Sequence, residues 1–289
     1  MTAVNDIIQG VLLGGLFALF ACGLSLLYGV VGVINLAHGD FAVLGAYIAV
    51  ALIPNVPYNA LWAVPLVIPI MVAVGYAMQR GVFARSLAVS PITTLLVTFG
   101  LSTVIENALL EGFSDNSHSL SIGSLVTSSF HIGSQISISY LRLGILVIAV
   151  LVLGGLQLML SRTSIGRQIR AVSDDREAAA VSGIRTGHVA GIAAAIAFGT
   201  VALAGIAYGT VSQFNPYSGA SLLLFSFEAV IIGGLGSLWG TLVGGMVLGV
   251  AQTLGPLVIS GSGALAGHLV FLLILAVRPS GFLPAKAPA

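Results

Sequence analysis

Long apolar stretches separated by short polar connections are the dominant pattern along the chain. A helix that crosses the hydrocarbon core of a membrane needs about 20 mostly apolar residues. Runs such as 144–156 are continuously apolar, whereas the strands of a membrane β-barrel would alternate over roughly ten residues. We therefore expect helices, whose backbone groups are satisfied within each segment. Nine candidate spans can be traced: 7–30, 36–53, 60–79, 91–110, 143–160, 188–211, 220–233, 237–258 and 264–277.

The basic residues indicate how these spans are threaded through a membrane. Cytoplasmic loops carry an excess of Lys and Arg, and only Arg142 of the ten basic residues lies at the far end of a span. The nine that can share the cytoplasmic side are Arg80, Arg85, Arg162, Arg167, Arg170, Arg176, Arg185, Arg278 and Lys286. The segment 111–140, which contains no Lys or Arg, is then an external loop, and 161–187 is cytoplasmic.

Two span counts fit this charge distribution. Nine full crossings place the N-terminus outside and the C-terminus inside. If 36–53 is re-entrant, eight crossings remain and both termini are inside. We predict an all-α protein, a polytopic integral membrane helical bundle with about eight transmembrane helices plus one or two broken or re-entrant segments. It forms a single domain over 1–289.

The composition excludes several classes of protein. Hydrophobic residues make up 57% of the chain and charged residues 7%, too few charges for a soluble enzyme or a disordered chain. The net charge of +1 gives no footprint for nucleic acid. Cys22 is the single cysteine, and no His, Cys, Asp and Glu residues have metal-ligand spacing. No serine has plausible triad partners, so we predict a protein without enzymatic activity or bound metal.

Glycines recur at four-residue spacing, which in a membrane lets helix backbones approach closely. The recurring sets are Gly10/Gly14, Gly205/Gly209, Gly236/Gly240/Gly244 and Gly245/Gly249. We interpret them as sites of tight helix packing.

Two further stretches, 29–41 and 227–240, place polar groups and glycines beside apolar helices. Paired interruptions in the two halves of a chain point to a transport pathway. An ionisable residue in a membrane helix costs about 2.5–3.5 kcal/mol on insertion scales and suggests function. The candidate pathway residues are Asn35, His38, Asp40, Glu106 and Glu228, and the candidate hinge glycines are Gly39, Gly233, Gly234 and Gly236.

Structural roles remain open for these residues. Glu106 could be interfacial, because Glu111 follows it closely. Glu228 could pair with a polar group across the bundle. Asn35 and His38 could cap a broken helix.

The segment 161–187 holds five of the ten basic residues, and its centre predicts a short helix. Asp174 is a candidate N-cap, and Glu177 stands three residues later as in a capping box. Ala178 and Ala179 favour helix, and Gly183 can adopt the left-handed conformation that ends one. We expect about eight residues and a smooth apolar surface that suits insertion into a groove of another protein.

The run from Glu177 to Gly183 resembles the EAA signature of ABC importer permeases, a helix that contacts the ATPase subunit. The 163–171 run, the 35–40 motif and the 233–237 motif narrow the match. Together they resemble the branched-chain amino acid permease family, in particular the shorter member of its paired permeases. The resemblance spans roughly residues 5–283.

The resemblance implies a permease subunit of an ATP-driven importer for branched-chain or other hydrophobic amino acids, located in the bacterial inner membrane. Its partners would be a second permease subunit, cytoplasmic ABC ATPase subunits and an external solute-binding protein. The chain itself has no P-loop, since its only lysine is Lys286 between two alanines. We therefore expect no cofactor on this chain and ATP on partner subunits.

Three alternatives remain open at this stage. A urea or short-amide permease would have the same architecture. An ion-coupled secondary transporter would use Glu106 or Glu228 and would need no ATPase. A passive channel would need no docking helix.

Overall fold

The computed structural model describes residues 2–52, 60–123, 128–132 and 136–283. Lys286 and parts of the predicted external loop 111–140 lie outside the described residues.

All nine apolar stretches form helices, which confirms the prediction of a helical membrane protein. Six of the described helices are long and apolar enough to cross a membrane, and three apolar helices are shorter. The long ones are α1 (Thr2–Val31), α3 with its continuation (Val64–Met78, extended to Leu87), α5 (Pro91–Phe113), α6 (Tyr140–Arg162), α9 (Thr186–Val211) and α11 (Leu238–Val258). The shorter ones are α2 (His38–Leu52), α10 (Ser218–Gly233) and α12 (Gly263–Val277).

The remaining elements are short. A 3-10 turn, η2 (Ala60–Ala63), precedes α3, and a π-helical stretch, η3 (Gln79–Phe83), joins α3 to α4 (Ala84–Leu87). Two helices, α7 (Ser164–Asp174) and α8 (Arg176–Val181), connect α6 to α9. Strands β1 (Ser129–Ile132) and β2 (Ile136–Ser139) pair as an antiparallel hairpin between α5 and α6.

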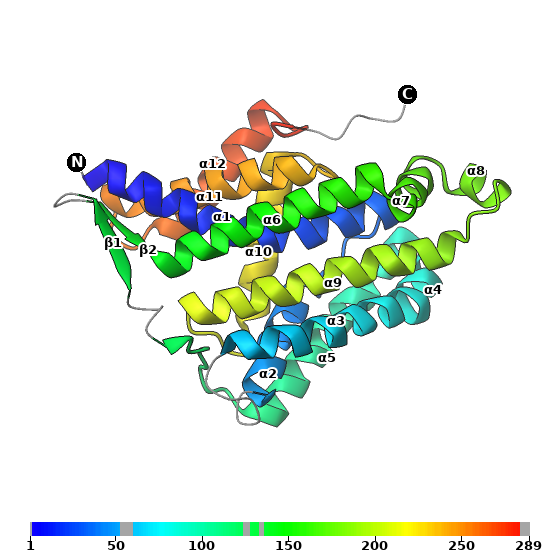
Figure 1. Ribbon diagram of the computed structural model, residues 1–289, viewed down its shortest axis with the longest axis horizontal. Coiled ribbons are helices and arrows are strands. Elements are labelled where there is room, and N and C mark those ends of the chain that lie inside the picture. The colour runs from blue at the N-terminus through cyan, green and yellow to red at the C-terminus, as the bar shows by residue number, and fades with distance from the viewer. Residues whose placement is uncertain (1, 53–59, 124–127, 133–135, 284–289) are drawn as a thin grey trace.

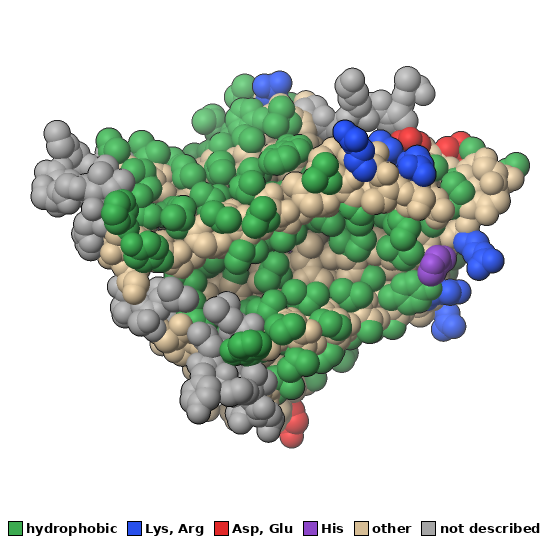
Figure 2. All heavy atoms as spheres, viewed as in Figure 1, with side chains coloured by type: hydrophobic (Ala, Val, Ile, Leu, Met, Phe, Trp, Pro, Cys, Tyr) green, Lys and Arg blue, Asp and Glu red, His purple; other side chains and the backbone are tan. Residues whose placement is uncertain are grey.

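Helices α1 and α9 form the centre of the bundle, and most of each is buried. In contrast, most residues of α3, α5 and α6 are not buried within the described structure. Figure 1 shows α1, α6, α9 and α11 running along the long axis, with α10 crossing them steeply. A space-filling view of the same face is predominantly apolar between its two ends (Figure 2).

Glycines allow the two most extensively packed helices, α1 and α11, to touch. A Cβ on Gly14 would lie 2.4 Å from Met246 Cα, and one on Gly249 would lie 2.2 Å from the Gly10 carbonyl oxygen. The same holds for Gly245, where a Cβ would lie 2.6 Å from the Gly14 carbonyl oxygen. Two glycine pairs read separately from the sequence are therefore the two sides of one crossing.

The bundle has two distinct ends, which are opposite in Figure 1. We call the end with the N-terminus and the β1–β2 hairpin the hairpin end, and the end with α7 and α8 the α8 end. Ser137 of the hairpin accepts through its carbonyl oxygen from Gln9 Nε2 and donates through its backbone N–H to Asn5 Oδ1. These bonds place the start of α1 beside the segment predicted to be external, which is the arrangement expected for nine crossings.

Basic side chains gather at the α8 end on the face shown in Figure 2. The segment predicted to be cytoplasmic thus lies at the opposite end of the bundle from the hairpin.

Candidate functional site

The first interruption predicted from the sequence is an irregular segment between α1 and α2, and it is buried. Asn35 is fully buried, and its Oδ1 accepts from the Ala37 backbone N–H at 3.1 Å. His38 Nε2 lies 2.9 Å from the Phe20 carbonyl oxygen, well before the end of α1. The chain therefore turns back into the bundle after α1. Asn35 caps this return, and His38 ties it to the middle of α1.

Asp40 lies in the first turn of α2 and is held by α5. Ser102 Oγ donates to Asp40 Oδ2 at 2.5 Å. One turn earlier on α5, Thr98 Oγ1 accepts from the Leu36 backbone N–H at 3.2 Å. Glu106 is half-buried one turn after Ser102. Because residues four apart share a helix face, these three residues form one polar stripe along α5.

This stripe brings three of the candidate pathway residues into one region. Asn35, Asp40 and Glu106 lie on or beside the contact between α2 and α5. The hydrogen bond to Asp40 comes from Ser102, and Glu106 lies one helical turn further along α5. The sequence contained the signal, since Ser90, Thr94, Thr98, Ser102 and Glu106 recur every four residues. Of this stripe, only Glu106 was among the residues predicted from the sequence.

Replacing Ser102 with alanine is expected to destabilise the protein by about 1–3 kcal/mol, because a buried carboxylate oxygen loses its partner. The measurement is thermal unfolding of the purified protein in detergent. Thr103→Ala is the matched control, because Thr103 is exposed and bonds only the carbonyl oxygen of Phe99 in its own helix. Equal unfolding temperatures for the two variants would show that the Asp40 contact adds nothing.

Glycines allow the start of α2 to approach α10 closely. A Cβ on Gly39 would lie 1.9 Å from the Gly219 carbonyl oxygen, and one on Gly219 would lie 1.8 Å from Asp40 Oδ1. Gly39, a predicted hinge glycine, lies in the first turn of α2. Its role in the described structure is close approach.

Glu228 is buried in α10 and pairs with α12, so it does not join the α2–α5 group. His268 Nδ1 lies 2.5 Å from Glu228 Oε1, and its ring stacks on Phe225 with the ring centroids 6.0 Å apart. Among the described residues, Glu228 Oε2 has no hydrogen-bond partner. His268 could not be recognised from the sequence, because its position in an apolar helix carries no spacing signal.

The Glu228–His268 contact predicts non-additive substitutions. Glu228→Ala and His268→Ala are each expected to lower the unfolding temperature, and the double variant to lose less than the sum. Contacting residues typically show coupling of about 0.5–3 kcal/mol. Thermal unfolding of the four proteins measures the coupling, and strictly additive losses would show that the two side chains act independently.

The second predicted interruption separates α10 from α11. Gly234 and Gly236 have φ of 104° and 78°, values that favour glycine. A Cβ on Gly233 would lie 2.1 Å from the Gly240 carbonyl oxygen. The segment after α12 packs against this interruption, because the Phe282 backbone N–H donates to the Ile232 carbonyl oxygen at 2.9 Å.

The segment 161–187 contains two helices, and the predicted cap was wrong by one residue. Asp174 is the last residue of α7, while Asp175 has extended backbone and its Oδ1 accepts from the backbone N–H groups of Glu177 and Ala178 at 2.9 Å. Helix α8 therefore has six residues, fewer than the eight expected, and Glu177 follows the cap by two positions. Gly183 has φ of 84°, which confirms the left-handed conformation at its end.

Helix α8 shows different faces to the bundle and to solvent. Ala179 is buried, whereas Ala178 is exposed and Val181 is 91% exposed. Beneath it, α7 buries Ile169 and Val172 in an apolar cluster with Ala179 and with two residues of α9, Val189 and Ala193. The α8 helix is thus fixed to α7 and α9 on one side and free on the other.

The amphipathic helix α7 also reaches α1. Ser173 Oγ donates to the Gly29 carbonyl oxygen. Beside this bond, a cavity of about 240 Å³ is bordered by α1, α6, α7 and Gly236 of the second interruption. Helix α7, on which α8 packs, and the second interruption therefore border the same cavity at the α8 end.

Comparison with known proteins identifies this bundle. Residues 7–278 match the family described as branched-chain amino acid transport system, permease component. The chain belongs to this family. The match confirms the resemblance drawn from the sequence motifs and the description as a multi-pass membrane permease.

Relatives are similar over most of their length. The high-affinity branched-chain amino acid transport system permease protein BraD of Pseudomonas aeruginosa is 30% identical over 97% of this chain and 95% of its own. LivH of Escherichia coli strain K12, described in the same words, is 26% identical with the same coverage. A probable branched-chain amino acid transport permease protein LivH of Methanocaldococcus jannaschii is 27% identical over 86% of this chain and 80% of its own. No solved structure matches the chain.

Proposed function

We propose that this permease is the membrane subunit of an ATP-driven ABC importer for branched-chain or other hydrophobic amino acids in the bacterial inner membrane. Family membership supports a permease. The relatives BraD and LivH are named as branched-chain amino acid permeases, which supports the substrate class. The partners would be a second permease, cytoplasmic ATPases and an external solute-binding protein.

The observation that carries the ATPase partner is the geometry of α8. Val181, an apolar side chain at the end of this capped helix, is 91% exposed in the part of the chain that the structure describes, so it adds little to the packing of these residues. Amphipathic or small apolar helices of this kind bind in grooves of partner proteins. The helix lies at the α8 end, where basic side chains gather on the face of Figure 2, as the positive-inside rule expects for the cytoplasm.

The packing beneath α8 supports alternating access. A displacement of α8 by the ATPase would be transmitted through Ala179 to Ile169 of α7 and Val189 of α9. The Ser173–Gly29 bond links the same movement to α1. Because α1 and α9 form the centre of the bundle, a small movement at α8 would be passed to both. ATP shifts the equilibrium between the outward-open and inward-open states, because it binds the ATPase subunits with different affinity in the two states.

The energy source is tested by uptake of radiolabelled leucine into cells that produce the chain with its partner subunits. We expect uptake to persist when proton and sodium gradients are collapsed and to stop when ATP is depleted. The reverse result would identify an ion-coupled transporter, and equilibration under both conditions would identify a channel. Competition by excess leucine but not by excess urea is expected for the proposed substrate class.

A further inference from the structure

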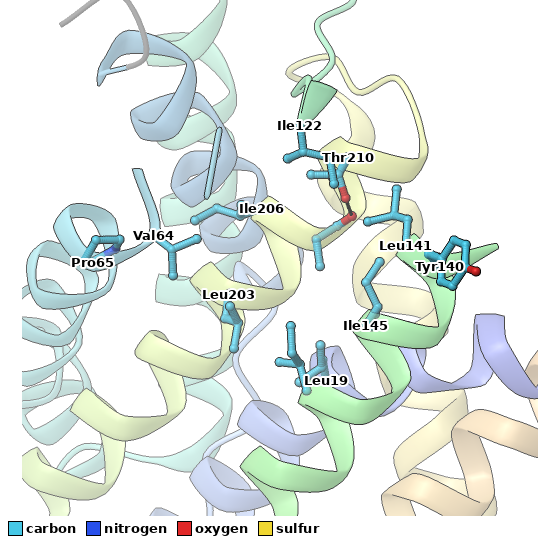
Figure 3. Close-up of a pocket in the computed structure, with 13 residues that line it drawn as sticks. Leu19, Val64, Pro65, Ile122, Tyr140, Leu141, Ile145, Leu203, Ile206 and Thr210 are labelled. Atoms are coloured by element: carbon cyan, nitrogen blue, oxygen red, sulfur yellow. Dashed lines mark hydrogen bonds between the residues drawn. The ribbon is translucent and has the colours of Figure 1, made fainter. Parts of the chain in front are cut away.

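Two adjoining cavities lie at the hairpin end, away from the two interruptions and from α8. The larger has a volume of about 400 Å³ and is bordered by α1, α3, α6 and α9. In Figure 3 the side chains of Leu19, Ile145 and Ile206 lie around one space between α6 and α9. Each of these three residues is at most 5% exposed. The inner wall of the cavity therefore consists of core side chains, whereas Tyr140 and Ile148 at its rim are 49% and 39% exposed. Apart from Pro65, Tyr140, Gly144 and Thr210, the lining is aliphatic.

The second cavity, about 260 Å³, is polar and shares Leu141 and Thr210 with the first. Its lining includes Arg142, Gln9 and two serines of the hairpin, Ser137 and Ser139. The two cavities together offer an aliphatic compartment joined to a polar one, within the size range of small-molecule sites.

Arg142 supplies a positive charge to the polar compartment. Its Nη1 donates to Gln9 Oε1 at 3.0 Å, and Gln9 Nε2 donates in turn to the Ser137 carbonyl oxygen. Gln9 thus orients the guanidinium without neutralising it, and no acidic side chain pairs with Arg142 among the residues that the structure describes. The guanidinium lies in the first turn of α6, where the positive end of a helix also favours an anion.

We propose that these joined cavities bind the transported amino acid at the hairpin end, with its carboxylate on Arg142 and its aliphatic side chain in the larger cavity. The inference rests on the proposed function for its substrate class. A guanidinium suits a carboxylate in bidentate geometry, and the hydroxyl and carbonyl oxygens of the hairpin suit an ammonium group. Arg142, which stood apart in the charge distribution, then has a specific role in substrate binding.

The charge is tested by ligand binding to the permease purified with its ATPase subunits, measured as thermal stabilisation at rising ligand concentration. The ligands are leucine and 3-methylbutylamine, which is leucine without its carboxyl group. We expect leucine to stabilise the wild-type complex and Arg142→Gln to weaken its apparent affinity by about tenfold or more. The variant should also lose the preference for leucine over the amine, which a merely structural defect would not change.

Filling the aliphatic cavity is the second test. Gly144 lines it, and a Cβ there meets no atom within 4 Å. We expect Gly144→Leu to abolish stabilisation by leucine while the protein still folds. Gly154→Leu is the matched control, since Gly154 lies on the same helix with equally open space but does not line the cavity. The control should bind leucine as the wild type does.

Three results would overturn the proposal. The first is that leucine fails to stabilise the wild type. The second is that leucine stabilises Gly144→Leu and Gly154→Leu to the same extent. Alternatively, phosphatidylglycerol rather than leucine could stabilise the complex in an Arg142-dependent manner, which would identify a lipid site. These assays measure binding without ATP, so failure of ATP-driven uptake in the wild type would instead count against the proposed function.

Discussion

Replacement of Val181 by aspartate is expected to reduce leucine uptake to background while leaving the permease folded. Val181 is 91% exposed at the end of α8, so the substitution disturbs no core contact. Placed in an apolar groove of the ATPase, a carboxylate would be desolvated without a partner, which costs several kcal/mol. The measurements are ATP-dependent uptake and the amount of ATPase subunit that copurifies with the permease.

Val89→Asp provides the matched control for this prediction. Val89 is 75% exposed and lies in the turn between α4 and α5. It should retain uptake and the bound ATPase. Full uptake and normal copurification in Val181→Asp would show that α8 does not contact the ATPase.

Gly183→Trp tests the same docking element by a different mechanism. A Cβ at this position meets no atom within 4 Å, so the bundle does not obstruct the side chain. The left-handed φ of 84° strains any residue other than glycine, and the indole would lie beside the predicted docking face. We expect loss of ATPase binding with the transmembrane helices intact.

Replacement of Gly14 by leucine is expected to abolish the folded permease altogether. The added Cβ would lie 2.4 Å from Met246 Cα and 2.8 Å from the Gly245 carbonyl oxygen, and neither backbone atom can yield. Overpacking costs 1–3 kcal/mol where side chains can shift, so we expect more than about 3 kcal/mol here. Size-exclusion chromatography of the detergent extract measures the remaining monodisperse protein.

The control for Gly14 is Gly100→Leu on α5. Gly100 is exposed, and a Cβ there meets no atom within 4 Å. This variant should be recovered at the wild-type level. Normal recovery of Gly14→Leu would contradict the observed approach of α1 to α11.

The sequence was sufficient to predict the helices and the glycine contacts, because both depend on local patterns. Apolar run length sets the spans, and four-residue glycine spacing marks a close approach wherever the partner lies. It could not show that Gly14 faces Gly245, since this pairing depends on how distant helices pack. For the same reason, His268 as the partner of Glu228 was not predicted.

The error at Asp174 has a local cause. Two adjacent aspartates can each cap a helix, and the choice depends on where the preceding helix ends. Helix α7 continues through Asp174, because Ile169 and Val172 are buried against α9. The extended residue is therefore Asp175, whose backbone N–H still bonds the Ala171 carbonyl oxygen at 3.1 Å.

The β1–β2 hairpin was not predicted from the sequence, because its strands have only four residues each.

The central claim, that α8 joins this permease to an ATPase, is tested most directly by affinity purification of the chain from its native membrane in mild detergent. Mass spectrometry then identifies the proteins that remain bound. We predict a cytoplasmic ATPase and a second permease in stable ratio, with the ATPase lost from Val181→Asp and Gly183→Trp. A well-folded chain recovered alone would contradict the claim and make gradient-driven transport the leading explanation.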